Sequence, residues 1–377
     1  MRWLWLWLLP AATLATAGTL PEERADLLYH RYSGGGVTVD GPSMLVRKQF
    51  GESVSVSANY YVDLISSASV DVVTTASPYT EEREQKSLAV DYLRGQSTYS
   101  AGVVNSSESD YVADTAWVSV AHEMFGDMTT VTLGYSQGRD EIGKRGDPLF
   151  REQLDRRNYR FGLTQVLTRE LLAGVNLETI TEQGYLQSPY RSLRYLTPQP
   201  GLWAYGPEQY PGTRTSTAAA ARLKGYLPWR ASAELHYRYF TDTWGVRAHT
   251  AGLEYLHPVG DRWTLSGRYR HYRQGAADFY ADLFPRADAQ NFMGRDKEYS
   301  TFRSHALGLG ASYRLPWQGP RWLARSAVTL QLDRSSTRYQ DFRNLVGRPP
   351  GSGTTPGTEP LYALDATVVQ VYLSAWY

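Results

Sequence analysis

The sequence of 377 residues contains no cysteine. That absence excludes disulfide bridges, thiolate metal sites and a cysteine nucleophile. An excess of either charge is also lacking, because 39 Lys and Arg stand against 38 Asp and Glu. Without a basic block the chain has no electrostatic footprint for nucleic acid. After residue 20 no apolar run approaches the roughly 18 residues of a membrane-spanning helix, which excludes a helical membrane protein.

The first residues are typical of a secretory signal peptide. Arg2 supplies a positive charge, residues 3–9 are all Trp or Leu, and Ala15-Thr16-Ala17 places small residues at a signal-peptidase site. We expect cleavage after Ala17, so that residues 1–17 are removed and residues 18–377 form one mature domain. The alternative, a short membrane anchor, would need a longer apolar segment.

Beyond this segment the chain alternates between apolar and polar residues. From residue 54 to residue 64 every even position is apolar and most odd positions are polar, and similar runs recur along the chain. A period of two indicates strands with one apolar and one polar face. A soluble sandwich could also produce this pattern, so the connections between the strands have to decide.

The connections alternate between short and long. Short ones lie near residues 51, 95, 126, 169, 229, 260 and 318, and long ones span 65–84, 141–155, 184–214, 276–299 and 341–360, with a smaller gap at 35–42. This pattern predicts an all-β fold, a transmembrane antiparallel β-barrel with short periplasmic turns and long extracellular loops. We expect about 16 strands, with 14 as the alternative. The 28 Tyr and 11 Trp fit the aromatic girdles of such a barrel.

The end of the chain resembles the signal that the outer-membrane insertion machinery reads. An alternating strand carries Val369, Val371 and Leu373 on one face and stops on the aromatic Tyr377. We therefore expect the barrel-insertion machinery and outer-membrane lipids as partners.

Several segments resemble a known bacterial family. They are residues 32–43 (YSGGGVTVDGPS), 58–63 (ANYYVD), 71–79 (DVVTTASPY), 240–245 (FTDTWG), 277–280 (ADFY), 288–292 (DAQNF) and the closing Trp376-Tyr377. The chain resembles the domain of unknown function 3570 family over essentially its whole mature length. The resemblance implies an outer-membrane protein of Gram-negative bacteria, in a setting with small lipoproteins and redox proteins. The family has no agreed activity, so it transfers no catalytic residue.

Motifs that carry chemistry are scarce. The sequence has no HxH and no HExxH motif. We expect no enzyme, no cofactor and no metal, with Asp278, Asp282 and Asp288 as weak candidates for calcium against the alternative of solvated loop charge. A barrel-wall hydrolase would need His236 and Asp242 together with a serine that no pattern identifies.

The polar face of the strands supplies candidate lumen residues. By parity the charged residues Asp63, Arg222, Lys224, Arg238, Arg262, Arg268 and Arg270 point inward. One interpretation is that they brace the wall through ion pairs. The other is that the arginines bias a water-filled pore toward anions, while inward acids neutralise part of their field.

The loop 184–214 is a candidate partner surface. It carries Tyr190, Tyr195, Trp203 and Tyr205 among several prolines. These aromatics could stack on sugars or on a partner chain, or could fold back as a constriction inside the barrel.

The sequence therefore predicts an outer-membrane channel or porin-like transport protein, because a barrel of this size normally encloses an aqueous lumen. The runner-up is a non-conducting scaffold that docks a small lipoprotein or an envelope redox partner. A barrel-wall hydrolase is third.

Overall fold

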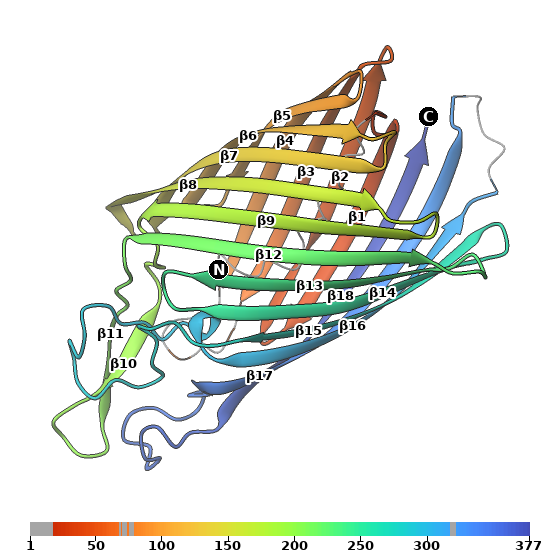
Figure 1. Cartoon of the computed structure of the whole chain (residues 1–377). Helices are drawn as coiled ribbons and strands as arrows, with labels where there is room; N and C mark the ends of the chain where they lie inside the picture. The colour runs from red at the N-terminus through yellow and green to blue at the C-terminus, as the bar shows by residue number, and fades with distance from the viewer. Residues whose placement is uncertain (1–17, 68, 70–73, 75–78, 317–321) are drawn as a thin grey trace.

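The structure is a computed structural model that describes residues 18–67, 69, 74, 79–316 and 322–377. Residues 1–17, where the signal peptide is expected, lie outside the described residues. Within the described part, sixteen antiparallel strands form one closed barrel (Figure 1). The prediction of an all-β barrel of about 16 strands is confirmed.

The wall strands follow one another in chain order, except that the step from β9 to β12 passes over a separate hairpin. The wall consists of β1 Arg24–Gly34, β2 Val37–Phe50, β3 Val54–Ser67, β4 Tyr79–Arg94, β5 Ser97–Ser107, β6 Tyr111–Met124, β7 Thr129–Lys144, β8 Asp147–Val166, β9 Leu171–Gly184, β12 Thr213–Tyr226, β13 Ser232–Asp242, β14 Arg247–Val259, β15 Trp263–Gln274, β16 Phe302–Arg314, β17 Arg325–Arg343 and β18 Leu361–Trp376. The hairpin is β10 Ser192–Leu196 with β11 Trp203–Pro207, and a short 3-10 helix, η2, spans Lys297–Tyr299. Among the described residues, no helix has the length and apolar character needed to cross a membrane.

The first and last wall strands close the barrel. β1 pairs with β18 from Arg24 opposite Trp376 to Gly34 opposite Ala366. Every wall strand therefore has two hydrogen-bonded neighbours and no sheet edge is left, as a sheet in lipid requires.

The residues of the expected insertion signal lie on or directly after this closing strand. Val371 and Leu373 are 40% and 44% exposed on the outer face of β18, which Val369 shares by parity. The hydroxyl of Tyr377 donates to the carbonyl oxygen of Arg47 at 2.8 Å. The terminal aromatic is thus anchored to β2 across the seam of the barrel.

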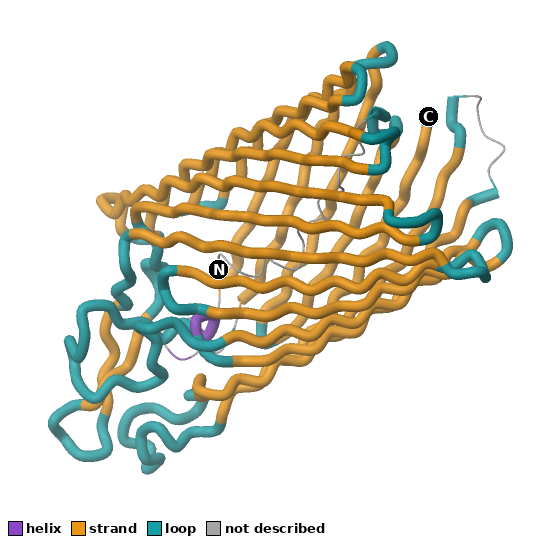
Figure 2. The backbone as a smooth tube through the Cα atoms, viewed as in Figure 1, coloured by secondary structure: helices purple, strands orange, loops and turns teal. Residues whose placement is uncertain are grey.

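The connections differ between the two ends of the barrel. The start of β1 and the end of β18 lie at the end with short connections, and the long loops gather at the other end (Figure 2). In an outer-membrane barrel the long loops are extracellular and the short turns periplasmic. The predicted division into short and long connections holds for most of the chain.

Two gaps that the sequence predicts as loops are strand instead. The gap 141–155 shrinks to Arg145 and Gly146, because the β7–β8 ladder continues with pairs such as Arg139 opposite Asp155. The gap 35–42 shrinks to Gly35 and Gly36, whose φ angles of 60° and 78° match a type I′ hairpin turn. Both faces of a hairpin that extends beyond the membrane meet water, so pairing persists there without apolar alternation.

The two faces of the wall differ as the alternation predicts. Leu309 and Leu332 lie opposite each other on β16 and β17 and are 61% and 47% exposed on the outer face. Gln331, the neighbour of Leu332, faces the interior. Trp263 and Tyr313 stack on the outer face near the short-turn end, with ring centroids 4.6 Å apart. This order of residues is that of an apolar band bordered by an aromatic girdle.

The membrane-facing band can be tested with two adjacent substitutions. Leu332→Arg places a charge on the lipid face and should lower the free energy of unfolding by about 2–4 kcal/mol, whereas Gln331→Arg on the lumen face should cost much less. Denaturant titration of both variants in lipid vesicles measures the difference. Equal losses would contradict the assignment of the two faces.

Candidate functional site

The interior of the barrel carries most of the predicted lumen residues. Burial alternates along β12, β13 and β15 so that Arg222, Lys224, Arg238, Arg268 and Arg270 lie on the face opposite the exposed leucines and tyrosines. Arg262 differs, because β15 begins only at Trp263. It is exposed in the turn before that strand, where its carbonyl oxygen accepts from the backbone N–H of Arg314. Arg262 therefore stands at the short-turn end and not on the inner wall.

Arg268 is paired across a glycine. Its Nε donates to Oδ1 of Asp333 at 2.7 Å, and Nη2 makes a second bond to the same carboxylate. In the strand register, Gly308 on β16 lies between Arg268 on β15 and Asp333 on β17. A Cβ at this position would come within 2.2 Å of the Asp333 carboxylate. The glycine makes room for this bidentate pair, which neutralises Arg268.

Other inward charges are also paired. Glu178 on β9 accepts from Nε of Arg160 at 3.1 Å and lies 3.5 Å from a nitrogen of Arg238. Lys224 lies 3.9 Å from Glu234. The bracing interpretation thus accounts for Lys224, Arg238 and Arg268.

A basic row crosses the inner wall beside these pairs. By register Arg222, His236, Gly252 and Arg270 lie side by side on β12 to β15. The imidazole of His236 covers Gly252, where a Cβ would come within 2.2 Å of the ring. Arg222 forms no ion pair with a carboxylate within the described residues. The row therefore places two arginines and a histidine at one level of the inner wall.

The His236–Asp242 pair considered for a hydrolase does not form. Asp242 instead accepts from Nε of Arg214 at 2.8 Å, and its other oxygen accepts from the backbone N–H groups of Trp244 and Val246. These bonds leave the carboxylate no role toward His236.

Asp63 belongs to a buried cluster that parity alone did not show. It is fully buried on β3, and its Oδ1 lies 2.8 Å from Nε2 of His30 on β1. The hydroxyl of Tyr61 is 3.1 Å from the same nitrogen, and Nε of Arg83 is 3.6 Å from the other oxygen. The strand between them carries Gly41, where a Cβ would come within 2.0 Å of a β3 carbonyl oxygen. Asp63 is therefore a buried residue that bonds other wall residues, and it is not exposed to the lumen.

The long loops form a cap at the extracellular mouth. We call residues 185–212, 243–246, 275–301 and 344–360 the loop cap. Its aromatic core comprises Tyr210, Trp244, Phe279 and Tyr299, with ring centroids 4.8–5.7 Å apart. This core packs with Ile142 and Leu154, which point inward from β7 and β8. Because loop residues cover inward-facing wall residues, the cap narrows the mouth.

An ionic cluster ties the loops of the cap together. Arg194 of β10 is fully buried and donates to Glu359 at 2.6 Å through Nη1, and to the carbonyl oxygen of Asp282 at 2.9 Å through Nε. Arg295 donates from Nε to the Asp282 carboxylate at 3.1 Å. The backbone N–H of Arg343 donates to that carboxylate at 3.0 Å. Three loops far apart in the sequence are therefore held at one point.

The aromatics proposed as a partner surface are largely part of this cap. Trp203 is 3% exposed and lies beneath the Arg194 guanidinium at 5.5 Å. Tyr195 packs on a small apolar cluster around Phe284. Tyr190 is 48% exposed, but its hydroxyl bonds Asp110 and the backbone N–H of Arg145. Tyr205 is half-buried on β11. These contacts place most of the four aromatics in the packing of the cap, and the hairpin β10–β11 lies beyond the ends of the wall strands (Figure 1).

The acidic calcium candidates do not converge. Asp282 is occupied by the arginines of the cap, whereas Asp278 and Asp288 are exposed. Within the described residues no three His, Cys, Asp or Glu side chains are grouped to hold a metal ion. Arginine bonding is the physical reason that Asp282 offers no calcium ligand.

A second set of charges in the cap is sensitive to protonation. Burial, followed by the charge of Asp296, raises the pKa of Glu208 to about 7, although Arg191 and the bond from the Tyr210 hydroxyl at 2.6 Å act against it. The backbone N–H of Arg295 also donates to Glu208, at 2.7 Å. Glu298 and Lys297 are close to Asp296, and burial raises the pKa of Glu298 as well. Arg191 thus faces three carboxylates.

The raised pKa of Glu208 gives the cap a pH dependence. A carboxylate with a pKa raised from 4.5 stabilises the folded cap most below pH 4.5, and this stabilisation is lost as the pH rises through about 7. Trypsin cleavage after the buried Arg295 should therefore accelerate between pH 5 and pH 8, after correction for trypsin activity on an unstructured peptide. Glu208→Gln should abolish most of the acceleration, and Asp261→Asn in an exposed short turn should not. A wild-type cleavage rate that does not change between pH 5 and pH 8 would contradict the role of Glu208.

Solved structures of outer-membrane barrels resemble this one. A chain described as a bacterial polysaccharide outer membrane secretin superposes with a TM-score of 0.50 at 9% identity, covering 95% of this chain and 100% of that chain. The outer membrane protein opdK from Pseudomonas aeruginosa gives 0.44 at 11% identity, covering 94% and 99%. OmpT of Vibrio cholerae gives 0.41 at 9% identity, covering 96% and 100%. The first likeness shows a shared β-barrel fold.

Among curated proteins no significant match to the sequence was found. A family model described as "Protein of unknown function (DUF3570)" matches residues 150–333, which run from β8 into β17. This match includes the resembling segments 240–245, 277–280 and 288–292, whereas the segments before residue 150 and the closing Trp376-Tyr377 lie outside it. The chain is an outer-membrane-type β-barrel whose residues 150–333 match the DUF3570 family model.

Proposed function

We propose that this barrel is a water-filled channel of the Gram-negative outer membrane whose extracellular mouth is narrowed by the loop cap. Residues 1–17 would direct its export. The observation that supports a wet lumen is the exposure of charged side chains on the inner wall. The side chains of Arg160 and Arg268 are 58% and 43% exposed, although both point into the barrel. A charge that is inside a protein and still exposed needs water around it.

The cap would restrict passage more than the wall does. Its aromatic core and the Arg194 cluster hold the loops across the mouth, and the inner wall below is polar. Channel activity would then depend on how firmly the loops are tied. The docking of a small lipoprotein or redox partner stays the alternative, in which the closed mouth serves as a platform.

Releasing the cap should increase conductance. Arg194→Ala leaves Glu359 and Asp282 buried without their main partner, which costs about 3–5 kcal/mol for a broken buried pair. The loops should loosen, and single-channel conductance in a planar bilayer should rise well above the wild-type value. Arg286→Ala, an exposed arginine of the same cap, is the matched control and should change little. If neither the wild type nor the Arg194 variant conducts while both are folded, the scaffold alternative takes the place of the channel.

The basic row should give the channel a modest preference for anions. Removing two of its charges with Arg222→Gln and Arg270→Gln should lower the anion-to-cation permeability ratio a few-fold at low salt, where screening extends to about 30 Å. Reversal potentials across a salt gradient measure the ratio. Arg262→Gln in the exposed turn is the control, and an unchanged ratio in the double variant would assign the row a bracing role only.

A further inference from the structure

The outer wall carries arginines in an unusual arrangement near the extracellular end. By register Arg273 on β15 lies opposite Arg303 on β16, which lies opposite Arg338 on β17. All three are exposed and share the outward face with the leucines of these strands. Arg338 pairs with Asp365 at 2.9 Å, whereas Arg273 and Arg303 have no carboxylate partner within the described residues. Together with Arg247 and Arg334 they form what we call the basic wall patch.

This arrangement costs stability unless something offsets it. Like charges directly opposite each other on neighbouring strands are destabilising. Elsewhere on the outer wall some cations have a carboxylate beside them: Lys86 lies 2.8 Å from Glu84, and Arg139 lies 3.2 Å from Asp155. Arg273 and Arg303 lie directly opposite each other without a carboxylate partner within the described residues, an arrangement that an external anion would complement.

The height of the patch on the wall identifies the kind of anion. On β16 the outward side chains change from Leu309 and Leu307 to His305 and then Arg303. His305 stacks near His271 at 4.6 Å and bonds the hydroxyl of Tyr269 at 2.7 Å. Aliphatic side chains are followed by aromatic and imidazole rings and then by cations. The same order is expected for side chains that face the hydrocarbon core, the interface and the headgroup layer of a membrane. From Leu309 to Arg303 the strand rises about 20 Å, less when tilted. At the long-loop end this level is the headgroup layer of the outer leaflet.

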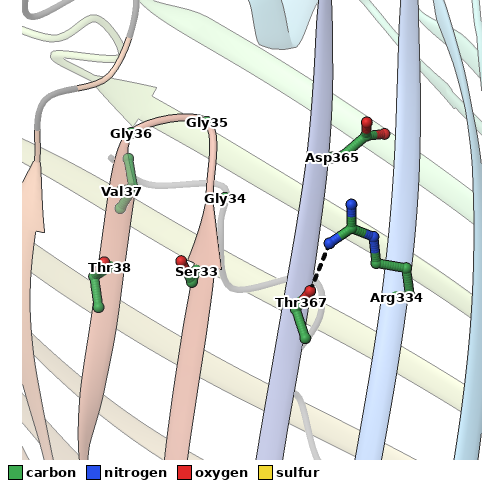
Figure 3. Close-up of a pocket in the computed structure, with 9 residues that line it drawn as sticks. All are labelled: Ser33, Gly34, Gly35, Gly36, Val37, Thr38, Arg334, Asp365 and Thr367. Carbon is green, nitrogen blue, oxygen red and sulfur yellow. Dashed lines mark hydrogen bonds between the residues drawn. The ribbon is translucent and has the colours of Figure 1, made fainter.

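The patch continues into a hollow at the seam of the barrel (Figure 3). Arg334 lies at its side and donates to the hydroxyl of Thr367 at 2.8 Å. The hollow is bordered by Gly34 at the end of β1 and by Gly35 and Gly36 of the β1–β2 turn. A polar headgroup next to the arginines would have room here.

We propose that the basic wall patch binds the phosphate groups of anionic lipid in the outer leaflet of the outer membrane. Arginine matches phosphate through bidentate hydrogen bonds, and several guanidinium groups at one level suit a headgroup with more than one phosphate. The proposal rests on the orientation of the barrel in the membrane and not on channel activity, because the patch faces away from the lumen.

Native mass spectrometry of the mature barrel, refolded in detergent and supplied with bis-phosphorylated lipid A, tests the proposal. Wild type should retain lipid A and not phosphatidylcholine, and excess inorganic pyrophosphate should not displace it. Arg273→Gln with Arg303→Gln should weaken retention by about 25-fold, which is about fivefold for each arginine. Arg139→Gln with Arg157→Gln, which removes outward arginines of β7 and β8, is the matched control and should retain lipid A. Equal retention by the patch variant and wild type, or equal retention of phosphatidylcholine, would overturn the proposal.

Thermal unfolding gives an independent test, because the effect of Arg303→Gln on the unfolding temperature should differ in sign between two kinds of vesicle. In phosphatidylcholine vesicles Arg303→Gln relieves repulsion, so its thermal unfolding should occur at the wild-type temperature or above it. In vesicles that also contain lipid A, the same variant should unfold below wild type. Destabilisation of equal size in both vesicles would mean that Arg303 serves the fold and not the lipid. Conductance should be the same in the variant and the wild type, so the lipid-binding proposal can fail or hold independently of the proposed channel activity.

Discussion

Backbone hydrogen bonding around a closed circle is the constraint on which the rest of this structure depends. In hydrocarbon an unpaired N–H or C=O costs several kcal/mol, so a sheet can span a membrane only when its first strand meets its last. Here β1 and β18 meet over the full length of β1. Closure makes every wall residue either outward or inward, and the chemistry of both faces follows from that division.

The inner face combines charge with small residues. Arg268 reaches Asp333 over Gly308, His236 covers Gly252, and His30 meets Asp63 across the strand that carries Gly41. At Gly308 and Gly252 the glycine makes room for a polar side chain from a neighbouring strand, and at Gly41 it lets the backbone of β3 come close. The wall is thus braced by ion pairs and covered glycines while a basic row around Arg222 is left for the lumen.

The cap depends on contacts between residues that are far apart in the sequence. Arg194 and Glu359 are 165 residues apart in the chain, and Arg194 and Asp282 are 88 apart. A fully buried arginine with two carboxylates is held only when all three loops are in place, so the cap behaves as one unit. Glu208 and Arg191 add a cluster whose charge depends on pH near neutrality. The packing of loops at the mouth and the polarity of the wall are therefore set by separate groups of residues.

The alternation of residues determined the closed barrel, the strand number and the face on which residues such as Arg222 and Arg268 lie. It could do so because each membrane-spanning strand has one face toward lipid and one toward the lumen, so the period of two is visible within a single strand. Local pattern also indicated most of the long loops. It failed for 141–155, where strand pairing continues above the membrane without alternation, and for Arg262, one residue outside its strand. Only the tertiary structure decided that Asp63 is buried with His30, that Trp203 and Asp282 belong to the Arg194 cluster, and that Arg273, Arg303 and Arg338 stand side by side. Those facts depend on the register between strands and on loops that meet across the mouth, and no periodicity along one strand encodes which residue will stand beside it on the next.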